Sequence, residues 1–189
     1  MILDLSEYGK FVLISAFRVP ETMDPAVTLG ELRTAIPERE IQFLDGGYVA
    51  GKEHLELAAI NASHAFKSRI NISRNLAMET LLYASAQRQI DTAIAKIGVT
   101  RASKTVGIVA FADTEGDTQV LQDKIAQILK VELSAELLEE WSEEKRRSIT
   151  ALFGISAKEL EAIKMPHQDI DGAIKKAVIE RVALLSTRL

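Results

Sequence analysis

The chain has 189 residues, of which 26% are charged and 47% hydrophobic, and its formal net charge is −4 at pH 7. This composition excludes an intrinsically disordered chain and is typical of one compact domain with a sizeable core. Because the sequence contains no cysteine, it also excludes disulfides and thiolate metal sites.

The sequence gives no signal for a membrane or an export route. No uninterrupted apolar run reaches the length that crosses a bilayer, and the N-terminal segment carries Asp4 and Glu7 where a signal peptide needs basic residues. We therefore expect a cytoplasmic protein without a membrane partner. The absence of cysteine agrees with a reducing compartment.

The first elements expected along the chain are a strand and a short helix. Residues 11–19 are rich in β-branched and aromatic side chains, which favours a strand covered on both faces. A helix is expected over residues 24–35, because Asp24 is a natural N-cap and Pro25 suits the first helical position.

A second strand is expected at residues 41–44, where it runs into a turn with two glycines. Beyond this turn, Tyr48 and Val49 are expected to continue the strand pairing. Apolar residues at spacings of three and four then predict a helix over residues 52–67. These signals indicate a small antiparallel sheet with helices packed against it.

The middle of the chain predicts helices around one strong strand. Ser73 is the expected N-cap of the next helix. Residues 105–112 give the strongest strand pattern of the chain. Further helices are expected at residues 89–97 and, after a turn at residues 113–117, at residues 120–129, and helix patterns dominate from Ser134 onward.

Together these elements predict one α+β domain over residues 1–189. It should contain a small, mainly antiparallel sheet surrounded by about seven or eight helices, with a helix-rich C-terminal third. Residues 133–165 are expected to form a helical elaboration, to which the sequence assigns no role. This segment holds a run of five acidic residues: Glu136, Glu139, Glu140, Glu143 and Glu144.

One interval, residues 57–78, contains no acidic residue although acids outnumber bases overall. Residues 52–104 carry eight basic and four acidic residues, whereas the rest of the chain carries 15 basic and 23 acidic ones. Lys67, Arg69 and Arg74 lie in the interval, where one expected helix ends and the next begins. Free N–H groups and the positive dipole end of the second helix favour an anion, so a phosphate is expected there. On charge alone, a solvated helix end is the alternative.

The segment Asn75–Gly98, with the sequence NLAMETLLYASAQRQIDTAIAKIG, resembles the signature helix pair of the PRPK-binding protein family. Members of this family are the small accessory subunit of the KEOPS complex. The resemblance extends from Asn61 to Ala112 in the order of elements: a basic loop, helices and an apolar strand. The C-terminal segment Ile170–Ser186 is similar to the last helix of that family. The order of elements carries more of this resemblance than any single residue.

The resemblance implies a subunit without a catalytic centre or a cofactor. In that family, the subunit holds the single-stranded 3′ CCA end of tRNA and docks on the kinase-like ATPase subunit of KEOPS. The complex transfers a threonylcarbamoyl group to an adenosine beside the anticodon. The compact, cysteine-free chain would suit an archaeal member, and no DNA partner is expected. Contacts with tRNA are expected at Lys67, Arg69, Arg74, Asn75 and Arg88.

The last expected helix offers a candidate surface for the kinase-like subunit. Ile174, Val178 and Val182 form an apolar stripe along it, which can dock in a partner groove or complete the core of the chain. Both interpretations are open from the sequence. The resemblance favours partner contact at these three residues.

Catalysis finds little support in the sequence. The three histidines have no metal-ligand spacing, and no glycine-rich loop that could cradle a phosphate occurs. We therefore expect no catalytic or metal-binding residues. The alternative function is a stand-alone α/β adaptor or small-ligand enzyme in which the basic loop is incidental.

Overall fold

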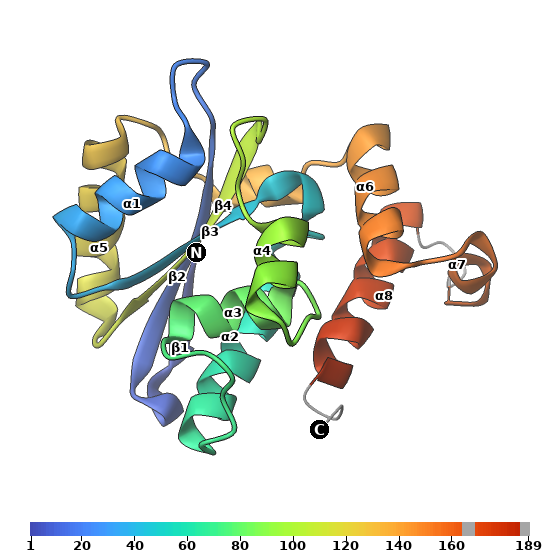
Figure 1. Ribbon diagram of the computed structural model, residues 1–189, viewed down its shortest axis with the longest axis horizontal. Coiled ribbons are helices and arrows are strands. Elements are labelled where there is room, and N and C mark those ends of the chain that lie inside the picture. Colours follow the sequence, from blue (N-terminus) through green and yellow to red (C-terminus); the bar gives the residue numbers. More distant parts are fainter. Residues whose placement is uncertain (164–168, 186–189) are drawn as a thin grey trace.

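The computed structural model describes residues 1–163 and 169–185. Within these residues the chain forms a four-stranded sheet in the order β1-β2-β4-β3, with helices on both faces (Figure 1). Every pair of neighbouring strands is antiparallel. The expected α+β class is thus confirmed. The strands are β1 (Ile2–Leu5), β2 (Lys10–Arg18), β3 (Glu40–Asp45) and β4 (Thr105–Ala112).

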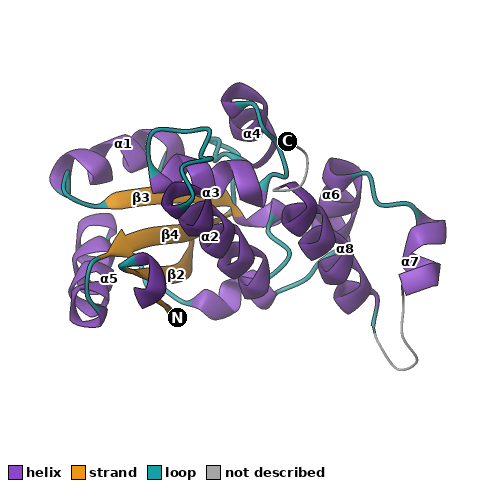
Figure 2. Ribbon diagram, turned by 90° about the horizontal axis from the view of Figure 1, so that it is seen from below, coloured by secondary structure: helices purple, strands orange, loops and turns teal. Residues whose placement is uncertain are grey.

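Two layers of helices enclose the sheet. α1 and α5 cover one face, while α2 and α3 cover the other and α6, α7 and α8 extend that layer to one side (Figure 2). None of the helices in the described residues is long and apolar enough to span a bilayer. The helices are α1 (Pro25–Ala35), α2 (Lys52–Lys67), α3 (Leu76–Ala84), α4 (Ile90–Ile97), α5 (Glu115–Leu129), α6 (Glu143–Phe153), α7 (Ala157–Ile163) and α8 (Ile170–Leu185).

The central strands β2 and β4 supply both cores. Because successive side chains of a strand point to opposite faces, Ile108 packs in the core under α1 and α5, and Val109 packs in the core under α2, α3 and α8. The edge strand β1 was not expected. It pairs with β2 from Ile2, opposite Leu13, and its four residues are too few and too exposed to give a clear pattern.

Several expected boundaries agree with the structure. The bounds of α2 and β4 are those predicted, and Asp24 caps α1 by accepting hydrogen bonds from the N–H groups of Ala26 and Val27. α5 begins at Glu115, five residues before the expected start, because the Thr114 hydroxyl caps it. The early start absorbs most of the turn expected before this helix.

The expected continuation of strand pairing after β3 is wrong. Residues Gly46–Tyr48 instead form a short 3-10 helix, η2. The Asp45 carboxylate accepts a hydrogen bond from the N–H of Gly47 at 2.9 Å and so caps this turn. The chain therefore passes from β3 directly toward α2 without a hairpin.

Residues 133–163 are helical as expected, whereas residues 164 and 165 lie outside the described residues. The segment begins with a 3-10 helix, η3 (Ala135–Glu139), and continues through α6 and α7. Each acid of the acidic run has a basic partner; four of these partners lie outside the segment, whereas Glu143 pairs within α6. That residues 1–189 form one domain stays a prediction. The ion pairs are Glu136–Lys52, Glu139–Lys175, Glu140–Arg18, Glu143–Arg146 and Glu144–Lys104.

Candidate nucleic-acid interface

The basic loop, residues 68–75, connects α2 to α3. At its start Arg69 adopts a left-handed backbone conformation with φ of 58°, which is uncommon for a residue with a side chain. The N–H of Ile70 then donates to the carbonyl of Ala65 at 2.9 Å, which ends α2 and turns the chain away from it. Local hydrogen bonds thus define the direction in which the loop leaves the helix.

The buried carboxylate of Glu79 fixes the middle of the basic loop. This side chain is 1% exposed, and it accepts hydrogen bonds from the N–H of Ser73 at 2.7 Å and from the N–H of Ile72 at 3.1 and 3.2 Å. A carboxylate that accepts several backbone N–H bonds in a buried place holds the main chain firmly. Glu79 therefore acts as the internal anchor of the loop.

The start of α3 differs from the expectation. Asn75, and not Ser73, is the N-cap, because its side-chain oxygen accepts the N–H of Met78 at 2.8 Å. The Ser73 hydroxyl instead donates to the carbonyl of Asn75. In addition, a Glu40 carboxylate oxygen accepts the N–H of Ala77 at 3.1 Å.

These contacts correct the expected mode of anion binding. Within the described residues, Glu79 already accepts the N–H of Ser73, one of the groups that were expected to receive a phosphate, and Glu40 and Asn75 accept two N–H groups in the first turn of α3. Two of these acceptors are carboxylates, brought in from β3 and from within α3. Fewer main-chain donors are therefore left for an anion at the basic loop than expected, so its binding would depend more on side chains.

The side chains of the basic loop offer both charge and apolar surface. Arg69 and Arg74 are exposed, and neither side chain forms an ion pair or hydrogen bond in the part of the chain that the structure describes. Ile70 and Ile72, between them in sequence, are 43% and 40% exposed. Lys67, the last residue of α2 and so just before the loop, is more constrained, since its ammonium donates to the carbonyl of Glu7 at 3.0 Å and lies 5.3 Å from the ring centre of Tyr8.

Comparison with known families agrees with this arrangement of elements. The profile of the family described as kinase binding protein CGI-121 matches residues 27–186. The chain belongs to this family. The match covers the basic loop and all of α8, and it confirms the resemblance to the PRPK-binding proteins. A comparison with curated proteins gave no match.

The remaining expected RNA contacts in this CGI-121 family member are spread more widely. Asn75 lies in the basic loop, where its side chain is used as a cap. Arg88 is exposed in the connection between α3 and α4. Since α3 has nine residues, its two ends lie about 14 Å apart. The structure therefore brings Lys67, Arg69 and Arg74 to one end of α3 and leaves Arg88 at the other.

The surface of α8 that was expected to contact the kinase partner is buried inside the protein. Ile174 is 1% exposed, and Val178 and Val182 are 0% exposed. All three pack in the core with α2 and α3 because α8 turns its apolar stripe inward. The expectation of partner contact at these residues is thus corrected to a core role. The outer side of α8 carries the exposed residues Lys176 and Glu180.

No sequence signal pointed to Glu40, Glu79 or Tyr8 as parts of this region. Glu40 lies 37 positions from the N–H that it accepts, and Tyr8 belongs to a segment far from the basic loop in sequence. Glu79 follows the acid-free interval directly, but its spacing from Asn75 does not form the usual capping pair. These contacts join residues that come together only in the folded chain, so the sequence alone could not reveal them.

Proposed function

We propose that this CGI-121 family member is a non-catalytic subunit of the KEOPS tRNA-modification complex. It would hold the single-stranded 3′ CCA end of tRNA and dock on the kinase-like ATPase subunit while the complex modifies the adenosine beside the anticodon. Its place of action would be the cytoplasm. The observation that carries the RNA-binding part is the basic loop, which exposes Arg69 and Arg74 around two isoleucines.

The chemistry of single-stranded RNA suits this loop. Phosphates pair with guanidinium groups, and unstacked bases gain from contact with apolar or planar side chains. Arg69 and Arg74 would contact phosphates, while Ile70 and Ile72 would contact the faces of bases or riboses. Because no partner inside the described chain has to be displaced from either arginine, their charge is available to RNA.

A binding experiment with two forms of tRNA tests the RNA-binding part. The purified protein should retard tRNA with an intact CCA end in a native gel and should fail to retard the same tRNA trimmed of CCA. The affinity should fall as salt rises, because neutralised phosphates release counterions. Equal retardation of both forms would contradict recognition of the CCA end.

Docking on the kinase-like subunit is supported by the description of the family as kinase-binding proteins. We place the contact on the outer side of α8, where Ile170, Lys176 and Glu180 are exposed. This surface leaves the basic loop free for RNA, as the joint function requires. Recovery of the kinase-like subunit and its complex in a pull-down from native cells would distinguish this function from that of a stand-alone adaptor.

A further inference from the structure

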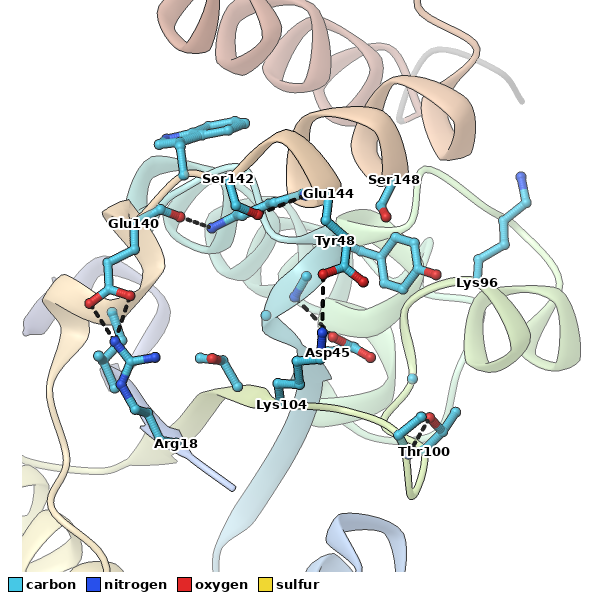
Figure 3. Close-up of a pocket in the computed structure, with 18 of the residues that line it drawn as sticks. Arg18, Asp45, Tyr48, Lys96, Thr100, Lys104, Glu140, Ser142, Glu144 and Ser148 are labelled. Carbon is cyan, nitrogen blue, oxygen red and sulfur yellow. Dashed lines mark hydrogen bonds and ion pairs between the residues drawn. The ribbon is translucent and has the colours of Figure 1, made fainter. Parts of the chain in front are cut away.

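A cavity of about 480 Å³ lies beside one end of the sheet (Figure 3). Its walls come from the end of β3 with η2, the last turn of α4, the connection from α4 to β4, and the segment from η3 to α6. None of its lining residues belongs to the basic loop. Its basic lining residues are Arg18, Lys96, Lys104 and Lys145.

The sheet register brings two of these cations together. Arg18, the last residue of β2, is paired with Thr105, the first residue of β4. The N–H of Val19 donates to the carbonyl of Lys104 at 2.9 Å, which continues the pairing by one step. Arg18 and Lys104 therefore lie at the same end of the central strands, and α4 adds Lys96 from its last turn.

Two carboxylates of the acidic run form ion pairs with Arg18 and Lys104. The Nη2 atom of Arg18 donates to both carboxylate oxygens of Glu140, at 2.7 and 2.9 Å. Lys104 donates to Glu144 at 3.0 Å, and Figure 3 shows both pairs across the pocket. Both cations are thus already paired with carboxylate oxygens of the protein itself.

Both ion pairs are open to solvent and easily replaced. The side chains of Arg18 and Glu140 are 65% and 55% exposed, and those of Lys104 and Glu144 are 80% and 72% exposed. Exposed pairs of this kind contribute little to stability. Glu140 lies between η3 and α6, outside both helices, so its side chain can turn away without breaking a helical hydrogen bond.

If the side chains of Glu140 and Glu144 moved away, the charges left in the pocket would favour an anion. Lys96 forms no side-chain hydrogen bond or ion pair within the described residues. The third carboxylate of the pocket, Asp45, is held by the Ser103 hydroxyl at 2.6 Å and by the N–H of Gly47. Arg18 and Lys104 would therefore face the cavity with no carboxylate paired to them, and Lys96 adds a third positive charge in the wall, although Figure 3 shows its side chain extending away from the other two.

We propose that this pocket binds a small phosphate ester in competition with the carboxylates of Glu140 and Glu144. A phosphate monoester carries up to two charges and three acceptor oxygens, so one group can contact Arg18 and Lys104 together. The cavity has the volume usual for a small-molecule site and leaves room beyond the phosphate. The ring of Tyr48 in the pocket wall offers a surface for the esterified group (Figure 3).

Calorimetry with AMP and with inorganic phosphate at low ionic strength tests this site in the whole 189-residue chain. AMP should bind saturably to the wild type. The Glu140→Gln/Glu144→Gln variant removes both competing carboxylates and should bind AMP about tenfold more tightly. The Arg18→Gln/Lys104→Gln variant should lose saturable binding of both probes.

Glu136→Gln/Glu143→Gln is the matched control for the first variant. It removes two negative charges from the same acidic run, but Glu136 pairs with Lys52 and Glu143 with Arg146, and neither lines the pocket. Its AMP affinity should stay close to that of the wild type. If the control gained as much AMP affinity as Glu140→Gln/Glu144→Gln, the effect would be due to the overall charge of the protein. That result would overturn the proposal. The proposal would also be overturned if neither AMP nor inorganic phosphate bound to the wild type or to Glu140→Gln/Glu144→Gln, even if an RNA oligonucleotide bound to them.

Discussion

A single buried histidine links three helices of the larger core. The Nδ1 atom of His54 accepts the N–H of Ala50 at 3.1 Å, and its Nε2 atom donates to the carbonyl of Ala84 at 2.8 Å. Its ring also meets that of Phe153 edge to face. Burial lowers the pKa of His54 to about 4, because a charged imidazole would lose its hydration there. A second proton would also face the Ala50 N–H donor.

We predict that the free energy of unfolding falls as the pH drops from about 6.5 toward 4. The unfolded chain binds a proton at His54 in this range and the folded chain does not, so stability is fully present above 6.5 and is lost below it. The loss from this residue should reach about 3 kcal/mol at pH 4. Urea unfolding monitored at a series of pH values measures it.

Two variants isolate the contribution of His54. His54→Gln should be less stable than the wild type at neutral pH but should show a shallower dependence on pH. His64→Gln, which changes an exposed histidine of the same helix, should keep the wild-type dependence. An equally steep dependence in His54→Gln would assign the effect to other groups.

The two exposed arginines of the basic loop support the second prediction. Arg69→Glu/Arg74→Glu should abolish tRNA binding, because each change replaces a phosphate partner by a repelling charge. The melting temperature should stay within a few degrees, since neither side chain has a partner to lose in the described chain. Filter binding and thermal unfolding measure the two effects.

The control for this variant reverses two exposed basic residues elsewhere. Arg147→Glu/Lys158→Glu makes the same change in net charge on α6 and α7. It should reduce tRNA affinity far less than the loop variant. Unchanged affinity in Arg69→Glu/Arg74→Glu would show that the RNA contact lies elsewhere.

At the scale of elements, the junction of α2, the basic loop and α3 depends on internal acceptors. Glu79 and Glu40 take up main-chain N–H groups that the sequence alone left available. Internal carboxylates therefore fix the main chain of this junction, while the arginine side chains of the loop are exposed to solvent. This arrangement separates the shape of the loop from the charge that it presents.

This separation predicts that Glu79→Gln weakens tRNA binding although it removes a negative charge. Glutamine cannot accept the N–H groups of Ile72 and Ser73 as a carboxylate does, so the loop should lose its fixed form. The free energy of unfolding should fall by about 1–3 kcal/mol. Glu53→Gln, a change at an exposed residue of α2, is the control and should leave both quantities nearly unchanged. Tighter tRNA binding by Glu79→Gln would mean that net charge, and not loop shape, governs affinity.

At the scale of the whole molecule, α8 is bound to its neighbours by apolar and charged contacts. Its inner stripe lies in the core, and Lys175 and Arg181 form ion pairs with Glu139 and Glu159. Gly51, with φ of 99°, allows the close approach of Lys175, because a Cβ there would lie 2.9 Å from the Cε of that lysine. The helix is therefore an integral part of the fold.

The inner and outer sides of α8 should respond differently to substitution. Val178→Glu should unfold the protein, since it would bury an unpaired charge. Lys176→Glu/Glu180→Lys should keep the fold and the net charge, but it should reduce co-purification with the kinase-like subunit. The swap Lys158→Glu/Glu161→Lys on α7 is the matched control and should retain the subunit. Full retention by the α8 swap would place the docking surface elsewhere.

Elements whose signals are local could be predicted from the amino-acid sequence. The apolar spacing of α2, the β-branched run of β4 and the Asp24 cap of α1 each depend on neighbours within one or two turns, and all three were predicted correctly. The order of these elements also sufficed for the family resemblance. Local periodicity and capping carry this information because they act between residues close in sequence.

Which charged and apolar groups remain available for binding could not be predicted without the folded structure. Glu40 reaches the start of α3 across 37 positions, and Glu136 of the acidic run meets Lys52 across 84. The same holds for the stripe of α8, whose pattern is equally suited to a core or to a partner until the facing helices are in place. Charge and apolar character are properties of the sequence, but whether they are satisfied within the chain depends on contacts that only folding creates.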